Sequence, residues 1–172
     1  YIVMDADSKR VIEGANTQEK KLIASTTKIM TAIIAIENGS LDDKVKIDKD
    51  VLKAYGSNIY IEIDEEITLR DLLYGLLLRS GNDAAIEIAN CIAGSMDEFV
   101  RMMNDKAKNL GMENTTFINS SGLENDEKLG NTSTAYDMAL LMSYAIDNKT
   151  FVEISGTKRH IATTNYKTYD WY

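Results

Sequence analysis

The stretch Ser25-Thr-Thr-Lys-Ile-Met-Thr-Ala-Ile-Ile-Ala-Ile-Glu37 carries a clear helical signal. Its apolar residues recur at three- and four-residue spacing, as expected for one buried helical face, and they are Ile29, Ala32, Ile33 and Ile36. Gly39 follows where such a helix should end. The sequence therefore predicts a helix from Ser25 to Glu37 that packs into the core and has a serine and a lysine at its N-terminal end.

The remaining segments predict a mixture of helices and strands. Residues 1–5 and 9–13 are rich in β-forming residues and predict an antiparallel hairpin. Three capping-box patterns predict helix starts at Thr68, Ser95 and Thr134. Helical periodicity fades after Asp147, and residues 160–164 predict a strand that leads into an aromatic tail.

Composition limits the class of protein. The 172 residues are 44% hydrophobic and 27% charged, which is ordinary for one folded domain with a single core. A net charge of −8 disfavours nucleic acid as a partner, because a phosphate-binding surface would oppose the field of the molecule. No apolar run approaches the roughly 18 to 20 residues that cross a bilayer. We therefore expect membrane contact only through segments that this chain does not contain.

Ser25 and Lys28 place a hydroxyl and an amine three residues apart, on the same face of the predicted helix. A serine becomes a nucleophile when a base takes its proton, and lysine can be that base only if desolvation or nearby positive charge lowers its pKa. The pattern thus requires a buried Lys28. A chain of this length contains on the order of one such pair by chance. On its own, the motif is therefore better explained by two unrelated helix residues.

A second candidate element is Ser80-Gly-Asn82, a polar turn between the helices expected at 69–78 and 84–93. Ser80 can relay a proton, and the Asn82 amide can both donate and accept hydrogen bonds, which suits holding a peptide while Lys28 is kept oriented. A helix–glycine–helix corner capped by Asn82 is the structural alternative.

Penicillin-binding proteins and serine β-lactamases combine a Ser-x-x-Lys motif with a Ser-x-Asn-type motif, and this chain contains both in the same order. Through nearly its whole length the chain resembles low-molecular-mass D-alanyl-D-alanine carboxypeptidases, which are penicillin-binding serine peptidases. The resemblance lies in residues 24–31, 71–85, 109–117 and 133–139, and in the Asn-Thr-x-Phe-x-Asn-x-x-Gly-Leu phrase of residues 114–123. One departure is Ile23, where the family usually has proline.

The resemblance implies a mixed α+β fold of the β-lactamase/transpeptidase type, with an antiparallel sheet and a large helical cluster in a single domain over residues 1–172. It implies an extracytoplasmic enzyme of the bacterial cell envelope that removes the terminal D-alanine from peptidoglycan stem pentapeptides through an acyl-enzyme on Ser25. It also implies acylation by β-lactam antibiotics, and no metal or cofactor.

The resemblance also implies a role for each residue that matches the family's motifs. Lys28 would be the base, and Ser80 would pass a proton to the departing amine. Asn82 would bind the substrate's peptide carbonyl and steady Lys28. The backbone N–H of Ser25, at the start of the helix, would be one oxyanion donor.

The family's third motif, Lys-Thr-Gly, does not occur in the 172 residues. We expect the chain to stop before this motif, so that the domain is incomplete at its C-terminus and lacks the C-terminal sheet strands. Residues 155–158 and 167–169 do not replace the motif, because their order or neighbours are wrong. A penicillin- or peptidoglycan-binding domain without turnover therefore stays open. A serine β-lactamase is less favoured, because we find no Glu-x-x-Leu-Asn loop.

The other reactive side chains predict structural roles. His160, the only histidine, lies in an expected strand without a sequence hint of a catalytic partner. Cys91 is surrounded by small apolar residues, which predicts a packed core thiol. We expect the carboxylates on solvent-facing surfaces and the methionines on helix stripes, and neither set suggests a metal or cofactor site.

Overall fold

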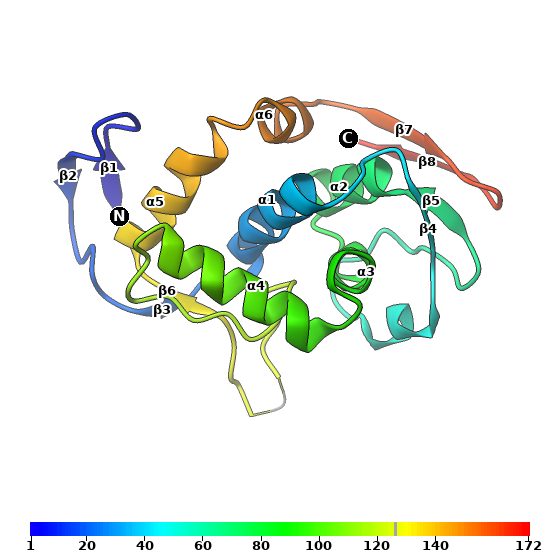
Figure 1. Ribbon diagram of the computed structural model, residues 1–172, viewed down its shortest axis with the longest axis horizontal. Helices are drawn as coiled ribbons and strands as arrows, with labels where there is room; N and C mark the ends of the chain where they lie inside the picture. The colour runs from blue at the N-terminus through cyan, green and yellow to red at the C-terminus, as the bar shows by residue number, and fades with distance from the viewer. Residues whose placement is uncertain (126) are drawn as a thin grey trace.

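The computed structural model describes residues 1–125 and 127–172. Helices fill the centre of the molecule, and short strand pairs lie around them (Figure 1). In chain order the elements are β1 (Ile2–Met4), β2 (Val11–Gly14), β3 (Lys21–Leu22), the 3-10 helix η1 (Ala24–Thr27), α1 (Lys28–Asn38), β4 (Lys44–Lys46), the 3-10 helix η2 (Lys49–Lys53), β5 (Glu66–Thr68), α2 (Leu69–Leu78), α3 (Asn82–Ala93), α4 (Met96–Asn109), β6 (Thr132–Ser133), α5 (Ala135–Ala145), α6 (Lys149–Ser155), β7 (His160–Thr163) and β8 (Thr168–Trp171).

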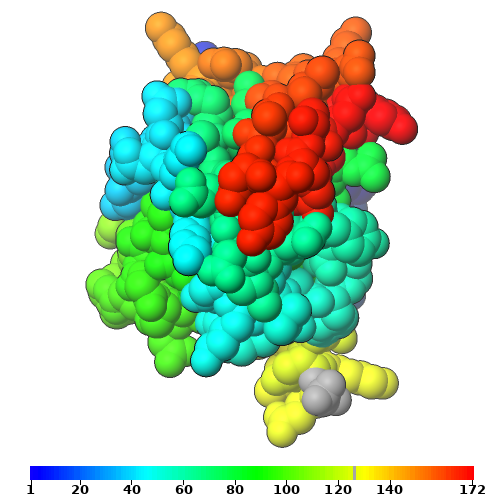
Figure 2. All heavy atoms as spheres, turned by 90° about the vertical axis from the view of Figure 1, so that its right-hand side faces the viewer, coloured from blue at the N-terminus to red at the C-terminus, as the bar shows by residue number. Residues whose placement is uncertain are grey.

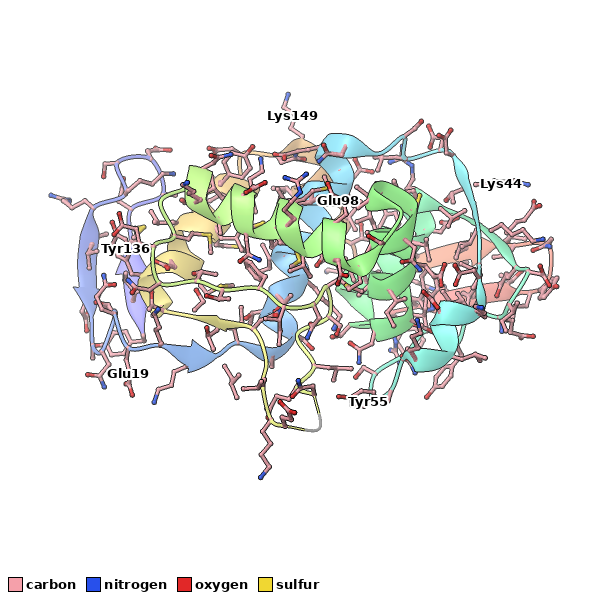
Figure 3. All side chains as sticks on the ribbon, turned by 60° about the horizontal axis from the view of Figure 1, so that its bottom comes forward. Glu19, Lys44, Tyr55, Glu98, Tyr136 and Lys149 are labelled. Carbon is pink, nitrogen blue, oxygen red and sulfur yellow. The ribbon has the colours of Figure 1, made fainter. Side chains whose placement is uncertain are left out.

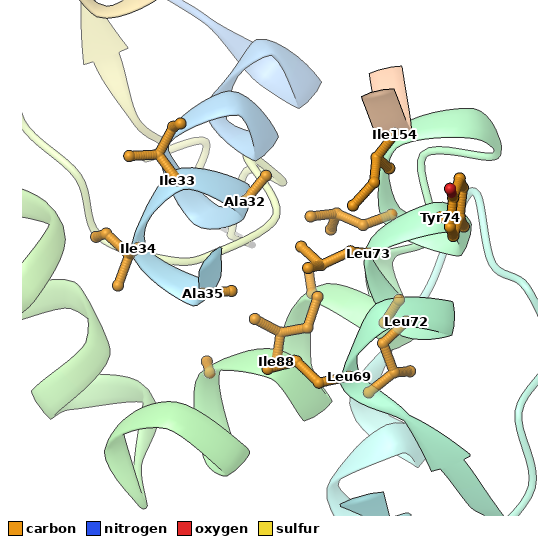
Figure 4. Close-up of a cluster of buried hydrophobic side chains, with 14 of the residues drawn as sticks. Ala32, Ile33, Ile34, Ala35, Leu69, Leu72, Leu73, Tyr74, Ile88 and Ile154 are labelled. Atoms are coloured by element: carbon orange, nitrogen blue, oxygen red, sulfur yellow. The ribbon is translucent and has the colours of Figure 1, made fainter. Parts of the chain in front are cut away.

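Helix α1 is the centre of the helical cluster. It contacts α2, α3, α4, α5 and α6, and its residues from Met30 to Ala35 are all buried. Figure 4 shows Ala32 and Ala35 on the side of α1 that faces Leu73 of α2 and Ile88 of α3. The buried surface of α1 is therefore wider than the single helical face that the sequence predicted, because a helix surrounded by other helices is buried on nearly every side.

The described strands pair antiparallel in four separate sheets, β1–β2, β3–β6, β4–β5 and β7–β8. The predicted N-terminal hairpin is confirmed, with Ile2 opposite Gly14, and it packs on α5. The predicted C-terminal strand is also confirmed, and the aromatic tail forms its partner β8, which contacts α2 (Figure 2). The β3–β6 pair joins distant parts of the chain, since Leu22 lies opposite Thr132.

The three predicted helix starts are confirmed. Thr68, Ser95 and Thr134 are the N-caps of α2, α4 and α5, and each side-chain oxygen accepts a hydrogen bond from the backbone N–H three residues later. Helix α6 was not anticipated by the fading pattern after Asp147. It has seven residues, with Phe151 and Ile154 buried, and so short a helix offers too few repeats for a periodicity to be recognised.

His160 and Cys91 are reactive side chains outside the two motifs, and the structure confirms the prediction for one of them only. His160 Nε2 lies 2.6 Å from Asp71 Oδ1, and its ring stacks on Tyr74 with 3.6 Å between centroids, so its predicted structural role is confirmed. The prediction for Cys91 was wrong, because this residue is exposed near the end of α3. Among the described helices, none is long and apolar enough to cross a membrane.

The prediction that the carboxylates face solvent was also wrong for several of them, and Glu87 on α3 is one example. Its side chain is only 2% exposed, and its Oε1 has no hydrogen-bond partner. Burial, followed by repulsion from Asp48, Asp50 and Asp83, raises the pKa of Glu87 to about 7, although a backbone hydrogen bond at Asp48 opposes the shift. The helical register places this residue on the inner face of α3, which composition alone does not reveal.

We predict that Glu87→Gln changes how stability depends on pH. The folded protein keeps the Glu87 proton up to about pH 7, whereas the unfolded chain loses it near the ordinary value of 4.5. The free energy of unfolding should therefore fall as the pH rises through this window, by roughly 1 to 3 kcal/mol, and the variant should lack that fall. Urea denaturation at a series of pH values from 4 to 8 measures the free energy of unfolding, and Glu153→Gln, at an exposed position, is the matched control. Equal pH dependence in wild type and Glu87→Gln would contradict the prediction.

Candidate active site

Ser25 and Lys28 lie together at the junction of η1 and α1. The predicted helix does not begin at Ser25, because Ser25 belongs to the 3-10 turn η1 and α1 begins at Lys28. In a 3-10 turn the side chains at i and i+3 are eclipsed, and Lys28 Nζ lies 3.2 Å from Ser25 Oγ. Ser25 is exposed while Lys28 is only 3% exposed, so the hydroxyl is open to a ligand and the amine lies beneath it.

The Lys28 amine is held by three oxygen atoms. Besides Ser25 Oγ, Nζ donates to Asn82 Oδ1 at 2.6 Å and to the backbone carbonyl of Ser121 at 3.0 Å. Burial lowers the pKa of Lys28 to about 8, although the negative charge of Asp83 acts in the opposite direction. The requirement for a buried lysine with a lowered pKa is thus confirmed. At pH 7 such an amine is neutral in about one molecule in ten.

Asn82 and Asp83 open helix α3 and fix the segment that precedes β5. Asn82 Nδ2 donates to the Tyr55 carbonyl at 2.6 Å while its Oδ1 accepts from Lys28. The buried Asp83 carboxylate accepts hydrogen bonds from three consecutive backbone N–H groups, those of Ile59, Tyr60 and Ile61. Asn82 is therefore held at both ends of its amide, and its predicted contact with Lys28 is present.

The Ser121 carbonyl reaches Lys28 because its loop is fastened to η1. Asn131, which is 1% exposed, accepts hydrogen bonds from the backbone N–H groups of Ile118 and Asn119 at 2.7 and 3.1 Å. Its Nδ2 donates to Thr27 Oγ1 at 2.9 Å, beside Lys28. Its carbonyl accepts from the N–H of Ile23 at 3.1 Å, a bond that proline at this position could not make.

Gly122 allows the same loop to approach the backbone in front of Ser25. Its φ is +87°, and a Cβ placed there would lie 1.8 Å from the Ala24 carbonyl oxygen. Only glycine combines this conformation with so close an approach. The loop therefore passes directly against η1, and the adjoining Ser121 carbonyl can enter the site.

Ser80 lies on the turn between α2 and α3, close in sequence to Asn82. Its φ of +55° is uncommon for a residue other than glycine, asparagine or aspartate, and such strain is frequent at functional sites. Among the described residues no hydrogen bond joins Ser80 to Ser25 or Lys28. The structure therefore brings Ser25, Lys28 and Asn82 into contact and places Ser80 on the adjoining turn.

Sequence reasoning did not identify Ser121, Asn131 or Asp83 as parts of the site. Ser121 contributes a backbone carbonyl, which any residue type could provide, so no side-chain pattern marks it. Within the described residues, neither Asn131 nor Asp83 is hydrogen-bonded to Lys28. Asn131 is hydrogen-bonded to Thr27, and Asp83 is hydrogen-bonded to the backbone of Ile59. The Asn-Thr-x-Phe-x-Asn-x-x-Gly-Leu phrase was the available signal, since it contains both Ser121 and Gly122.

Comparison with known proteins gives consistent matches. The family model described as D-alanyl-D-alanine carboxypeptidase matches residues 1–172. D-alanyl-D-alanine carboxypeptidase DacF of Bacillus subtilis is 37% identical over 161 residues, which cover 91% of this chain and 41% of that protein. DacC of Escherichia coli is 38% identical, over 82% of this chain and 37% of its own length. The chain thus spans about two fifths of the length of these relatives.

Solved structures agree with the sequence matches. The crystal structure of a D-alanyl-D-alanine carboxypeptidase from Mycobacterium tuberculosis H37Rv superposes with a TM-score of 0.92 and 31% identity, covering 98% of this chain and 63% of that one. A mutant of the Streptomyces K15 DD-transpeptidase gives a TM-score of 0.88 and 32% identity, over 98% of this chain and 70% of its own. The mixed α+β fold of the penicillin-binding/transpeptidase type is therefore confirmed, and the chain belongs to the D-alanyl-D-alanine carboxypeptidase family.

Proposed function

We propose that this chain carries the nucleophile and base of a serine-type D-alanyl-D-alanine carboxypeptidase. The observation that supports the proposal best is the buried Lys28 amine, 3.2 Å from the exposed Ser25 hydroxyl and with a pKa lowered to about 8. A neutral amine at this distance can accept the serine proton. The substrate would be a peptidoglycan stem peptide that ends in D-alanyl-D-alanine, in the extracytoplasmic cell envelope.

In the acylation step, Ser25 Oγ attacks the carbonyl carbon of the penultimate D-alanine as Lys28 Nζ accepts the hydroxyl proton. The tetrahedral intermediate collapses when the C–N bond breaks, and the departing amine of the terminal D-alanine takes a proton. Ser80 would relay that proton from Lys28, which regenerates the neutral base. Asn82 Nδ2 uses one N–H on the Tyr55 carbonyl and keeps a second N–H for the substrate's peptide carbonyl.

In the deacylation step, water adds to the carbonyl carbon of the Ser25 ester, the bond from this carbon to Ser25 Oγ breaks, and the shortened peptide leaves with a free carboxyl group. Lys28 is then the base that removes a proton from the attacking water, and it returns this proton to Ser25 Oγ, which restores both the serine hydroxyl and the neutral amine. The backbone N–H of Ser25 would stabilise the negative oxygen in both steps. A β-lactam would acylate Ser25 by the same first step.

The first prediction concerns the acylation site. Fluorescent penicillin should label the purified protein on the peptide that contains Ser25, because this hydroxyl is exposed and lies beside the amine. Ser25→Ala should abolish the label, whereas Ser155→Ala, at an exposed serine on α6, should leave it unchanged. Tandem mass spectrometry identifies the modified residue. Label on another residue, or full labelling of Ser25→Ala, would refute the assignment.

The second prediction concerns the base. Because only the neutral amine accepts a proton, the acylation rate should rise with pH and level off above about 8, the pKa of Lys28. Lys28→Arg keeps the charge and Lys28→Met keeps the apolar stem, and each should slow acylation by roughly a hundred- to ten-thousand-fold.

Stopped-flow measurements with a chromogenic β-lactam test this prediction, with thermal melting to show that both variants fold. The exposed Lys149→Arg is the control and should retain the wild-type rate and pH profile. Near-normal acylation by Lys28→Met would show that another group activates Ser25.

A further inference from the structure

The carboxylate of Asp83 is a buried charge that has no part in the acylation and deacylation steps described above. Asp83 follows Asn82 in the first turn of α3 and is only 2% exposed. Within the described residues no ion pair involves it, and its oxygens accept hydrogen bonds from four backbone N–H groups, those of Ile59, Tyr60, Ile61 and Ala84. Such bonds stabilise the ionised form but bring no opposite charge, so the field of this anion reaches its buried surroundings.

Asp83 also fastens the segment of residues 55–61 to α3, and hydrogen bonds run in both directions between them. The Asn82 N–H donates to the Ser57 carbonyl at 2.8 Å. The Asp83 N–H donates to Asn58 Oδ1 at 3.3 Å. These two N–H groups belong to the first turn of a helix and have no partner within it. The carboxylate is therefore held in one place, as a fixed electrostatic effect on a neighbouring group requires.

Asn82 connects this buried charge to the base. Its Oδ1 accepts from Lys28 Nζ at 2.6 Å, while its Nδ2 donates to the carbonyl of Tyr55. Figure 3 shows Tyr55 beside the projecting loop that follows Ser121. Lys28 and Asp83 are 3% and 2% exposed, so little water lies near them to screen their attraction. Burial lowers the pKa of Lys28 to about 8, and the charge of Asp83 opposes that lowering.

No other charge on the described elements around Lys28 has this effect on its pKa. Besides Asp83, the titratable side chains of these elements include Glu37, Tyr55, Tyr60, Arg79, Glu87 and Glu124. Glu37 lies at the far end of α1 and is paired with Lys106 at 2.6 Å. Glu124 is exposed, so water screens its charge. Asp83 is therefore the charged group, within the part of the chain that the structure describes, that opposes the desolvation of the base.

We propose that Asp83 is a positioning residue whose charge sets the pH range in which Lys28 can accept the proton of Ser25. With the carboxylate present, the amine keeps its proton to a higher pH than desolvation alone would allow. The same charge stabilises the ammonium form that arises each time Lys28 takes a proton in acylation or deacylation. This inference rests on the proposed function, because it concerns the acylation of Ser25.

The test measures the pH profile of acylation by a chromogenic β-lactam in Asp83→Asn. Asparagine keeps the size of the side chain and an acceptor oxygen for the 55–61 segment, but it removes the charge. We expect the midpoint of the profile to fall from about 8 by roughly one unit, because the ammonium form loses a nearby anion. The ratio of the rate at pH 6 to the plateau rate should then rise by about tenfold. This ratio cancels any uniform slowing that the substitution causes.

A second variant separates the charge from the attachment. Asn58→Ala removes the acceptor of the Asp83 N–H and loosens the same two segments, but it leaves the carboxylate in place. Loosening admits water to Lys28, which moves the midpoint toward the ordinary lysine value of 10.5. A fall in Asp83→Asn without a fall in Asn58→Ala supports the proposal. An unchanged or higher midpoint in Asp83→Asn, or an equal fall in both variants, overturns it.

Two carboxyl groups elsewhere provide matched controls. Glu87→Gln removes a carboxyl group one turn further along α3. Asp147→Asn makes the same change in net charge at an exposed position between α5 and α6. Both controls should keep the midpoint near 8. A fall in either control as large as that in Asp83→Asn would show that the effect does not belong to Asp83.

A third variant decides the matter if thermal melting shows that Asp83→Asn does not fold. Asn58→Asp keeps the acceptor of the Asp83 N–H and adds an anion at the same end of α3. Its midpoint should lie above that of Asn58→Ala, because a second negative charge favours the ammonium form of Lys28. A midpoint no higher than that of Asn58→Ala overturns the proposal.

A measurement that needs no turnover separates this inference from the proposed function. In protein that contains lysine labelled with carbon-13, the Cε signal that is missing in Lys28→Met belongs to Lys28, and its chemical shift follows the ionisation of the amine. The midpoint of this titration should be lower in Asp83→Asn than in the wild type. Equal midpoints overturn the inference alone, even where penicillin labels Ser25. Absence of label on Ser25 in the wild type overturns the proposed function, and the inference with it.

Discussion

The site depends on one physical constraint, the burial of the Lys28 amine, to which no carboxylate of the described residues is hydrogen-bonded. Its hydrogen-bond partners are a hydroxyl, an amide oxygen and a backbone carbonyl, all of which are uncharged. Desolvation therefore dominates and lowers the pKa. A carboxylate in place of Asn82 would stabilise the ammonium form and keep the proton on Lys28. An amide provides the same acceptor geometry without that charge, which explains why asparagine suits this position.

Much of the surrounding structure can be traced to the need to supply these acceptors from distant parts of the chain. Asn82 lies at the start of α3, where its Nδ2 donates to the Tyr55 carbonyl. The neighbouring Asp83 holds the backbone of residues 59–61, which follow Tyr55 in the chain. Ser121 arrives on a loop that Asn131 ties to Thr27 and that Gly122 lets pass against Ala24. The β3–β6 pair keeps the two ends of this arrangement together. Loosening any of these attachments would let water reach Lys28 and raise its pKa toward the ordinary lysine value.

The sequence predicted those features that are encoded by residues close together in the chain. The three capped helices and the N-terminal hairpin were predicted correctly, because capping and alternation are encoded within a few residues. Ser25 and Lys28 were recognisable for the same reason. Helix α6 was too short to show a period. The Ser121 carbonyl, the support from Asn131 and the burial of Glu87 arise from contacts between segments far apart in the chain, which one sequence does not reveal.

The 3-10 turn at Ser25 shows why the boundary of the helix matters for chemistry. In a continuous α-helix, residues three apart already lie on one face, offset by about 60° around the helix axis. Ser25 lies in the turn Ala24–Thr27 and Lys28 is the C-cap of that turn, so the tighter winding brings the two side chains closer to eclipsed, and Lys28 Nζ lies 3.2 Å from Ser25 Oγ. The cost is a less favourable hydrogen-bond geometry, which the packing of Gly122 against Ala24 and the bond from Asn131 to Thr27 help to offset. The pairing of Ser25 and Lys28 is thus a property of the tertiary structure as well as of the four-residue motif.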